Sequence, residues 1–220
     1  ESIIACQLEQ PVIGQFNSWR LSVSLGVNLL PTTHKICSFD CLYCECGSLH
    51  SQPLNSSKLP SSELIYNSLH DKLKEMSEAG ILPNAITFAG NGEPTLHPNF
   101  EGIIDDTIVL RDKFAPNAKV SVLSNATQLH RESVVNALGK VNDCILKIDA
   151  GNEETISILN QPNCKYSLDD VIKKIKLMGS NLVIQTMFVK WNINGKEYNN
   201  TDERHVNQWL EIISLIKPPR

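Results

Sequence analysis

Three absences narrow what this sequence can encode. No apolar run approaches the ~20 residues that a helix needs to cross a bilayer, so we expect no membrane-spanning helix and no membrane partner. The net charge of −4 gives no general attraction to nucleic acid or to anionic lipid. Residues 1–6 lack the basic and apolar regions of a secretory signal peptide. Because the chain does not begin with Met, we expect further residues before Glu1.

The cysteines lack the pattern of a secreted disulfide framework. Such a framework distributes an even number of cysteines along the chain, whereas this sequence has seven. Three of the seven are gathered in one short cluster. We therefore expect a reducing, cytoplasmic location.

The composition suits a single globular domain. The chain has 220 residues, of which 41% are hydrophobic and 20% are charged. Residues 1–20 show no clear periodicity and contain Pro11, Gly14 and Asn17, so we interpret them as an irregular N-terminal leader. Residues 21–220 are the predicted core domain.

Strands and helices alternate along this core domain. The patterns predict strands at residues 21–29, 85–90, 119–125, 143–150 and 182–190. They predict helices at residues 61–79, 100–114, 131–138, 152–159, 168–178 and 201–216, the last of which begins after an N-cap at Thr201. A strand that alternates with a helix five times implies parallel strands joined by right-handed crossovers.

The first predicted strand indicates the shape of the sheet. Leucines and valines occupy one of its faces, whereas Ser22, Ser24, Gly26 and Asn28 occupy the other. A small polar face suits the lumen of a barrel that holds a ligand. We therefore predict a barrel or partial barrel rather than an open doubly wound sheet. Pro218 and Pro219 end the last helix, and this ending predicts that a sixth strand follows the given chain.

A long loop at residues 30–60 carries Cys37, Cys41 and Cys44 in the order C-x3-C-x2-C. Three thiolates in one loop can surround a metal centre, and thiolates select zinc, Cu(I) or iron–sulfur clusters. Structural zinc needs a fourth ligand, whereas a [4Fe–4S] cube held by three cysteines keeps one iron open. Spacing alone leaves both possibilities open. Candidate fourth zinc ligands are Cys46, His34 and His50.

Polar residues follow the other predicted strands. The carboxyl ends of barrel strands meet at one face, so we expect these residues to converge near the cysteine loop. Individually, each residue has an ordinary structural explanation as a turn, a helix cap, a satisfied carboxylate or a buried amide. In chain order they are Gly92-Glu93-Pro94-Thr95, Ser124-Asn125, Lys147 with Asp149 on one face, and Gln185.

The cysteine motif, with Tyr43 before its last cysteine, resembles the cluster loop of the radical S-adenosyl-L-methionine (radical SAM) superfamily. Gly92-Glu93-Pro94-Thr95 resembles that superfamily's Gly-Glu-Pro motif. The resemblance extends from about Arg20 to the end of the chain. Further motifs resemble a branch of stand-alone proteins grouped with wyosine-type tRNA-modifying enzymes. These motifs are Ser24–Val27, Lys147–Gly151 and Gln185–Val189.

The resemblance implies a partial (β/α) barrel, a [4Fe–4S] cluster and SAM as cofactors, and a role for each candidate residue. Cys37, Cys41 and Cys44 are the implied catalytic cluster ligands. Reductive cleavage of SAM would give a 5′-deoxyadenosyl radical that takes a hydrogen atom from substrate. An external reductant such as a flavodoxin or ferredoxin is implied. The substrate class stays open, with a tRNA nucleoside or a small metabolite as candidates, although the charge does not favour nucleic acid.

The implied SAM contacts come from the remaining strand ends. Glu93 would accept from the methionine ammonium, in the turn that Gly92 and Pro94 shape. The other implied contacts are Ser124 and Asn125 to the carboxylate or ribose, backbone near Tyr43 to the adenine, and Asp149 and Gln185 to the ribose or substrate.

The alternative is a non-catalytic, zinc-stapled module that binds RNA or protein. It would leave Glu93, Asn125, Asp149 and Gln185 unexplained. Among the other cysteines, we interpret Cys46 as a neighbour of the cluster and Cys144 as a core residue. A second cluster that uses Cys6, Cys46 and Cys164 is a further alternative.

Overall fold

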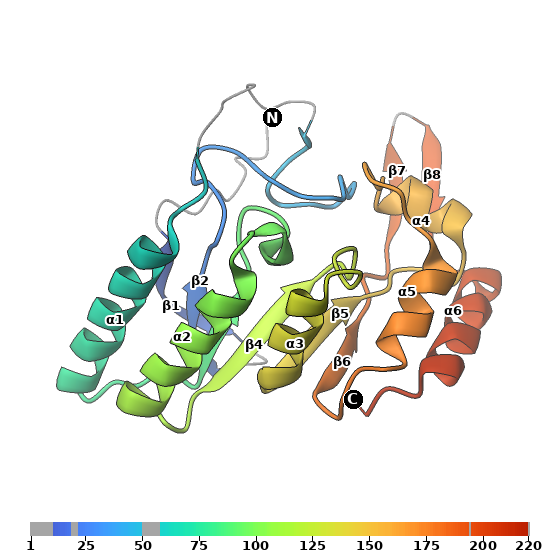
Figure 1. The fold of residues 1–220 in the computed structure, drawn as a ribbon. Helices are drawn as coiled ribbons and strands as arrows, with labels where there is room; N and C mark the ends of the chain where they lie inside the picture. The colour runs from blue at the N-terminus through green and yellow to red at the C-terminus, as the bar shows by residue number, and fades with distance from the viewer. Residues whose placement is uncertain (1–10, 19–21, 50–57, 194, 220) are drawn as a thin grey trace.

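The computed structural model describes residues 11–18, 22–49, 58–193 and 195–219 (Figure 1). Its main sheet has six strands in the order β1-β2-β3-β4-β5-β6. The strands are β1 (Val12–Ser18), β2 (Ser22–Val27), β3 (Ala85–Phe88), β4 (Lys119–Ser124), β5 (Asp143–Lys147) and β6 (Leu182–Gln185). Strands β2 to β6 are parallel, which confirms the five predicted parallel strands.

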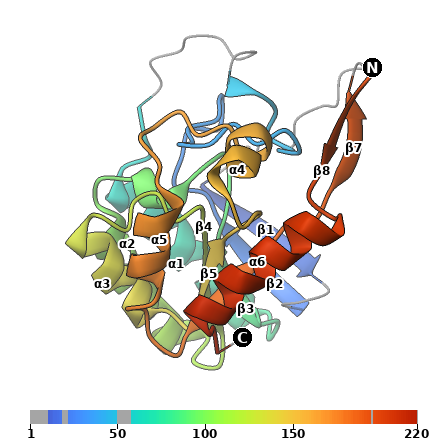
Figure 2. The ribbon, with the colours of Figure 1, turned by 90° about the vertical axis from the view of Figure 1, so that its right-hand side faces the viewer.

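Helices lie between the parallel strands, and one more follows the final strand. They are α1 (Ser62–Glu78), the short 3-10 helix η2 (Pro94–Leu96), α2 (Phe100–Phe114), α3 (Glu132–Lys140), α4 (Glu153–Leu159), α5 (Leu168–Ile175) and α6 (Glu203–Ile216). Figures 1 and 2 show α1, α2, α3 and α5 together on one face of the sheet. None of the helices in the described residues is both long and apolar enough to span a membrane.

The two faces of β2 explain how the sheet combines a core with a polar interior. Leu25 and Val27 are fully buried and belong to the same apolar cluster as Leu69 of α1. Full burial of such side chains stabilises the fold by about 1.5–3 kcal/mol each. Ser24 lies on the opposite face, is 5% exposed, and shares a 2.7 Å hydrogen bond with Thr87 of β3. The predicted division of this strand into an apolar and a small polar face is therefore confirmed.

The N-terminal segment corrects one prediction. Part of the predicted irregular leader forms β1, which pairs antiparallel with β2. The register of this pair shifts between Ile13 and Gln15. Such a bulge breaks the two-residue alternation that identifies a strand in sequence, and Gly14 lies at that position.

The segment before α6 corrects a second prediction. The predicted strand at residues 182–190 ends at Gln185, and an antiparallel hairpin of β7 (Lys190–Ile193) and β8 (Lys196–Asn199) follows it. Figure 2 shows this hairpin projecting beyond the sheet. The N-cap of α6 is Asp202 rather than the predicted Thr201, because the Asp202 side chain accepts a hydrogen bond from the His205 backbone N–H. Thr201 instead donates to Asn199 through its backbone N–H and its hydroxyl.

Candidate active site

Backbone contacts join the cysteine loop to the Gly-Glu-Pro turn. The Ile36 N–H donates to the Asn91 carbonyl at 2.9 Å, and the Glu93 N–H donates to the Ile36 carbonyl at 3.0 Å. Between them Gly92 has φ +137°, and a Cβ there would lie 1.8 Å from the Ile36 carbonyl oxygen. Only glycine allows this approach, so the two motifs predicted separately are one structural unit.

The segment after α4 holds the other side of the cysteine loop. Leu42 donates through its backbone N–H to Leu159 at 2.9 Å, and Asp40 donates to Asn160 at 2.9 Å. The Asn163 N–H returns a bond to the Ser38 carbonyl at 3.0 Å. The loop is thus held between the turn after β3 and the segment at residues 159–163 by hydrogen bonds within the protein.

A buried ion pair organises the inside of the loop. Lys35 and Asp40 lie 3.0 Å apart, with side chains that are 1% and 6% exposed. The Lys35 ammonium also donates to the Gly47 carbonyl at 3.0 Å. Asp40 accepts from the Leu49 N–H at 2.9 Å and from the Ser48 hydroxyl at 2.7 Å. Burial alone would raise the Asp40 pKa, but these donors and the Lys35 charge hold it below its usual value.

The three motif thiols differ in acidity. Burial raises the pKa of Cys37 to about 12 and also raises that of Cys41. The pKa of Cys44 is lowered to about 5, first because Cys46 donates a hydrogen bond to it and also because the Lys35 ammonium is close. A metal must displace the protons of Cys37 and Cys41 to bind them, so cluster binding will release protons.

The chemistry of the motif thiols fits an iron–sulfur cluster. Thiolates are soft ligands of the kind that iron–sulfur clusters take, and a [4Fe–4S] cube held by three cysteines keeps one iron open. Within the described residues, no three His, Cys, Asp or Glu side chains are gathered tightly enough for a single metal ion.

The other cysteines described here are separate from this set. Cys144 is fully buried in the apolar core, as predicted. The Cys46 sulfur lies 3.6 Å from the Gly90 carbonyl oxygen, beside the loop. Cys164 is exposed, and its thiol lies 3.9 Å from the Ser38 carbonyl. Cys6 and His50, which the sequence analysis named as alternative ligands, lie outside the described residues.

Strands β3 and β4 bring together the predicted residues Glu93, Ser124 and Asn125. The Glu93 carboxylate is buried and accepts from the Ser124 hydroxyl at 2.8 Å and the Asn125 N–H at 2.7 Å. It also accepts from the backbone N–H and the hydroxyl of Thr95, at 3.1 and 2.5 Å. Burial raises the Glu93 pKa, and these donors oppose the rise. Pro94 is buried at the start of η2 and fixes the turn.

Asp149, at the end of β5, is the centre of a second polar group. Its side chain is fully buried. The carboxylate accepts hydrogen bonds from the Asn160 amide at 2.6 Å, from the Met187 N–H at 2.8 Å and from the Tyr43 hydroxyl. This bond brings the aromatic residue of the cysteine motif into the group. The Lys147 ammonium lies 3.5 Å from the carboxylate and 5.0 Å from the centre of the Tyr43 ring.

Gln185 pairs in register with Lys147 at the end of β6. Its half-buried side chain makes no hydrogen bond with any other described residue. The structure thus places all the predicted site residues at the carboxyl ends of β2 to β6. Their contacts with SAM or substrate stay predictions.

Sequence reasoning missed Lys35, Asp40 and Asn160. Lys35 and Asp40 flank the first cysteine, but charged loop residues are usually solvated, and nothing in the sequence indicates their burial. Asn160 follows α4 as an ordinary C-cap would. Only the close approach of residues 159–163 to the cysteine loop reveals its position.

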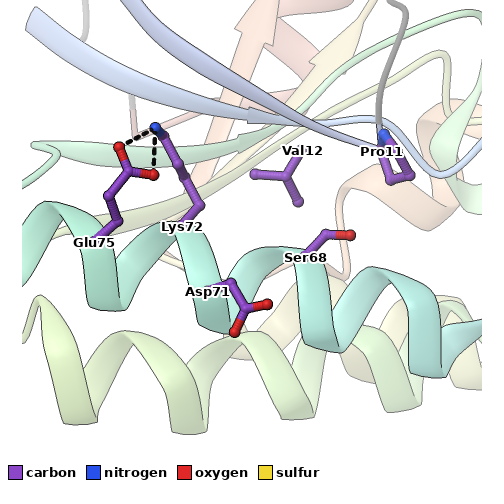
Figure 3. Close-up of a pocket in the computed structure, with 6 residues that line it drawn as sticks. All are labelled: Pro11, Val12, Ser68, Asp71, Lys72 and Glu75. Atoms are coloured by element: carbon purple, nitrogen blue, oxygen red, sulfur yellow. Dashed lines mark hydrogen bonds and ion pairs between the residues drawn. The ribbon is translucent and has the colours of Figure 1, made fainter.

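Two pockets differ in their relation to this site. A pocket of about 240 Å³ adjoins the cysteine loop. It is lined by Asp40, Cys41, Leu42, Cys44, Glu45, Gly47, Ser48 and Gln161. A larger pocket of about 350 Å³ lies between α1 and the start of β1 (Figure 3). Its lining residues, which include the ion pair of Lys72 and Glu75, contain none of the predicted site residues.

A sheet of parallel strands with three thiols and a Gly-Glu-Pro turn at one mouth defines a class of iron–sulfur proteins. Residues 32–201 match the family described as the radical SAM superfamily, and the chain belongs to it. Membership of this superfamily implies a [4Fe–4S] cluster and SAM as cofactors, and the donor set described above fits the cluster.

Several known proteins are similar to this chain in sequence or in fold. A UPF0026 protein of Synechocystis sp. is 29% identical over 94% of this chain and 72% of its own length. The fold resembles a radical SAM methyltransferase from Sphaerobacter thermophilus, with a TM-score of 0.60, 11% identity and coverage of 93% and 64% of the two chains. It also resembles archaeal TYW1, with a TM-score of 0.51, 13% identity and coverage of 89% and 62%. The chain spans only 29% and 53% of two other curated relatives.

Proposed function

We propose that this protein is a radical SAM enzyme that holds a [4Fe–4S] cluster on Cys37, Cys41 and Cys44. When bound, the cluster and SAM would supply a 5′-deoxyadenosyl radical that abstracts a hydrogen atom from substrate. The observation that carries the proposal is the set of three motif thiols in a loop that backbone bonds join to the Gly-Glu-Pro turn. Superfamily membership supports the same conclusion.

The chain's own residues would bind, orient and shield the reactants. Backbone groups of the Gly92–Pro94 turn lie beside the cysteine loop, where the methionine part of SAM would need partners. Four donors already surround the Glu93 carboxylate, so its first role is to fix the ends of β3 and β4. Three of these bonds end on Oε1, and Oε2 accepts only from the Asn125 N–H, so on this proposal an ammonium contact to Glu93 would use the other lone pair of Oε2. Asp149 would likewise orient Tyr43.

The cofactor assignment is tested by anaerobic reconstitution. We expect about four irons per chain, as a [4Fe–4S] cluster requires, and formation of 5′-deoxyadenosine when dithionite and SAM are added. Replacing Cys37, Cys41 or Cys44 with Ala should abolish SAM cleavage, while Cys46→Ala, the matched control, should largely retain it. One zinc per chain without 5′-deoxyadenosine would instead support the zinc-stapled binding module. Loss of the cluster in Cys46→Ala would show that the ligand set is wrong.

The substrate is proposed at the level of class, as a tRNA nucleoside or a small metabolite. The likeness of the fold to archaeal TYW1 supports a nucleoside, whereas the net charge of −4 counts against tRNA binding by this part of the protein alone. We further propose a flavodoxin or ferredoxin as electron donor, in the reducing cytoplasm. The reconstituted enzyme, supplied with SAM, dithionite and fractions of deuterium-labelled cell metabolites, would identify the substrate, because the fraction that transfers deuterium into 5′-deoxyadenosine contains the hydrogen donor.

A further inference from the structure

Asn160 lies between a motif cysteine and a buried carboxylate. It is 1% exposed, and its amide nitrogen lies 3.3 Å from the Cys41 sulfur and 2.6 Å from Asp149 Oδ2. The same nitrogen is 2.9 Å from the Tyr43 hydroxyl oxygen. An ionised carboxylate only accepts hydrogen bonds, so the side chain must present its nitrogen, rather than its oxygen, to this group. Its two N–H bonds are therefore directed at Asp149 and its neighbours.

Asn125 has a similar position at the other side of the loop. Its amide nitrogen lies 3.7 Å from the Cys37 sulfur and 2.9 Å from the Ser38 hydroxyl oxygen. Its amide oxygen accepts from the Thr127 N–H at 3.1 Å and from the Thr127 hydroxyl at 2.8 Å. These two bonds fix the orientation of the amide and direct the nitrogen at the cysteine loop. Two of the three motif sulfurs thus face an amide donor from outside the loop.

We propose that Asn160 and Asn125 are positioning residues that donate to the Cys41 and Cys37 thiolates and so raise the reduction potential of the bound cluster. This inference rests on the proposed function, because it requires the cluster. Hydrogen bonds to the sulfurs of a cluster withdraw negative charge and stabilise the reduced form, which carries one more electron. Asn160 has the larger effect, because its contact is shorter.

Charge near Cys41 gives a second reason for the larger effect of Asn160. The Asp149 carboxylate is fully buried and shares the Asn160 amide with the Cys41 sulfur. Without this amide, a buried negative charge would face the cluster with less compensation, and its field acts strongly in a low-dielectric interior. Loss of the Asn160 hydrogen bond and the less compensated charge of Asp149 would both lower the reduction potential of the cluster.

The experiment is an EPR-monitored redox titration of the reconstituted protein without SAM. At the wild-type midpoint, we expect Asn160→Ala to lower the ratio of reduced to oxidised cluster about tenfold, which corresponds to about 59 mV for one electron. Asn125→Ala should lower the ratio less. Asn163→Ala is the matched control, because the Asn163 amide donates to the Cys37 carbonyl at 3.0 Å and to no sulfur. It should leave the midpoint unchanged.

Asn160→Asp provides a second variant of nearly the same shape, in which an acidic group replaces the amide donor. We expect its midpoint to fall at least as far as that of Asn160→Ala. Unchanged midpoints in both Asn160 variants would overturn the inference. A folded protein that loses the cluster in both variants would also overturn it, because the role would then be structural. Failure of the wild-type protein to bind a [4Fe–4S] cluster would instead overturn the proposed function.

Discussion

The two sides of the barrel mouth differ in how far the protein satisfies its own polar groups. We call Glu93, Ser124 and Asn125 the closed wall, because each is at most 6% exposed and is hydrogen bonded within the protein. We call Lys147, Gln185 and Met187 the open wall. Met187 is 42% exposed, and the Lys147 side chain is 19% exposed.

This difference separates two tasks of the proposed enzyme. The closed wall adjoins the cysteine loop, and its buried hydrogen-bond network would keep the proposed cluster ligands in place. The open wall carries an ammonium, an amide and an exposed apolar side chain that a further molecule can reach. We infer that cofactor geometry depends on the closed wall and that substrate contacts come from the open wall.

Gly92→Ala should break the closed wall most severely. The added Cβ would lie 1.8 Å from the Ile36 carbonyl oxygen, at a φ of +137°. We expect a loss of about 3 kcal/mol or more in the free energy of unfolding, with failed cluster incorporation. Urea denaturation and iron analysis measure both. Gly139→Ala in α3 is the control, since a Cβ there meets nothing within 4 Å. Alanine should raise the free energy of unfolding by at most about 1 kcal/mol. Equal stability of the two variants would contradict the prediction.

Glu93→Gln should weaken the closed wall, although the glutamine side chain has nearly the same shape as the glutamate. An amide nitrogen would replace one oxygen and face a donor that now bonds to the carboxylate. We expect the free energy of unfolding of the iron-free protein to fall by about 1–3 kcal/mol, because at least one buried donor loses its acceptor. A stability equal to wild type would show that the carboxylate charge is not needed to hold β3 to β4.

The acidity of the motif thiols offers a test that depends on pH. Cys44 has a pKa of about 5 and is a thiolate at pH 7, whereas Cys37, with a pKa of about 12, stays protonated. Iodoacetamide should therefore label Cys44 much faster than Cys37 in the reduced, iron-free protein at pH 7. Mass spectrometry of the peptides measures the rates. In Cys46→Ala, which lacks the donor to Cys44, labelling at pH 6 should slow; an unchanged rate would exclude this hydrogen bond as the cause.

Gln185→Ala should have the smallest effect on folding. The Gln185 side chain makes no hydrogen bond with any other described residue, so we expect the free energy of unfolding to change by less than about 0.5 kcal/mol. Cluster content and uncoupled SAM cleavage should remain, while turnover of the natural substrate should fall. A stability loss as large as that of Glu93→Gln would remove the distinction between the two walls.

The sequence predicted those features that depend on regular patterns. Alternation of apolar residues located β2, and the order of strands and helices implied a parallel sheet with its polar ends at one mouth. The hairpins of β1 and of β7 with β8 were missed, because a bulge interrupts β1 and because β7 and β8 have only four residues each.

Contacts between distant segments were beyond prediction from one sequence. Asp149 was expected to lie near the cysteine loop, but its bonds with Tyr43 and Asn160, which are 106 and 11 residues away in the chain, could not be foreseen. The burial of Lys35 follows from the path of the whole loop rather than from its neighbours in sequence. Residue types therefore indicated the chemistry, while the supporting network needed the three-dimensional structure.

The backbone bonds of the cysteine loop also determine how changes elsewhere in the chain reach its thiols. The two flanks of the loop are held by peptide groups of the turn after β3 and of residues 159–163, and the Lys35–Asp40 pair closes the loop from within. A substitution that shifts either of these distant segments would therefore displace the thiols through the backbone, without touching a cysteine.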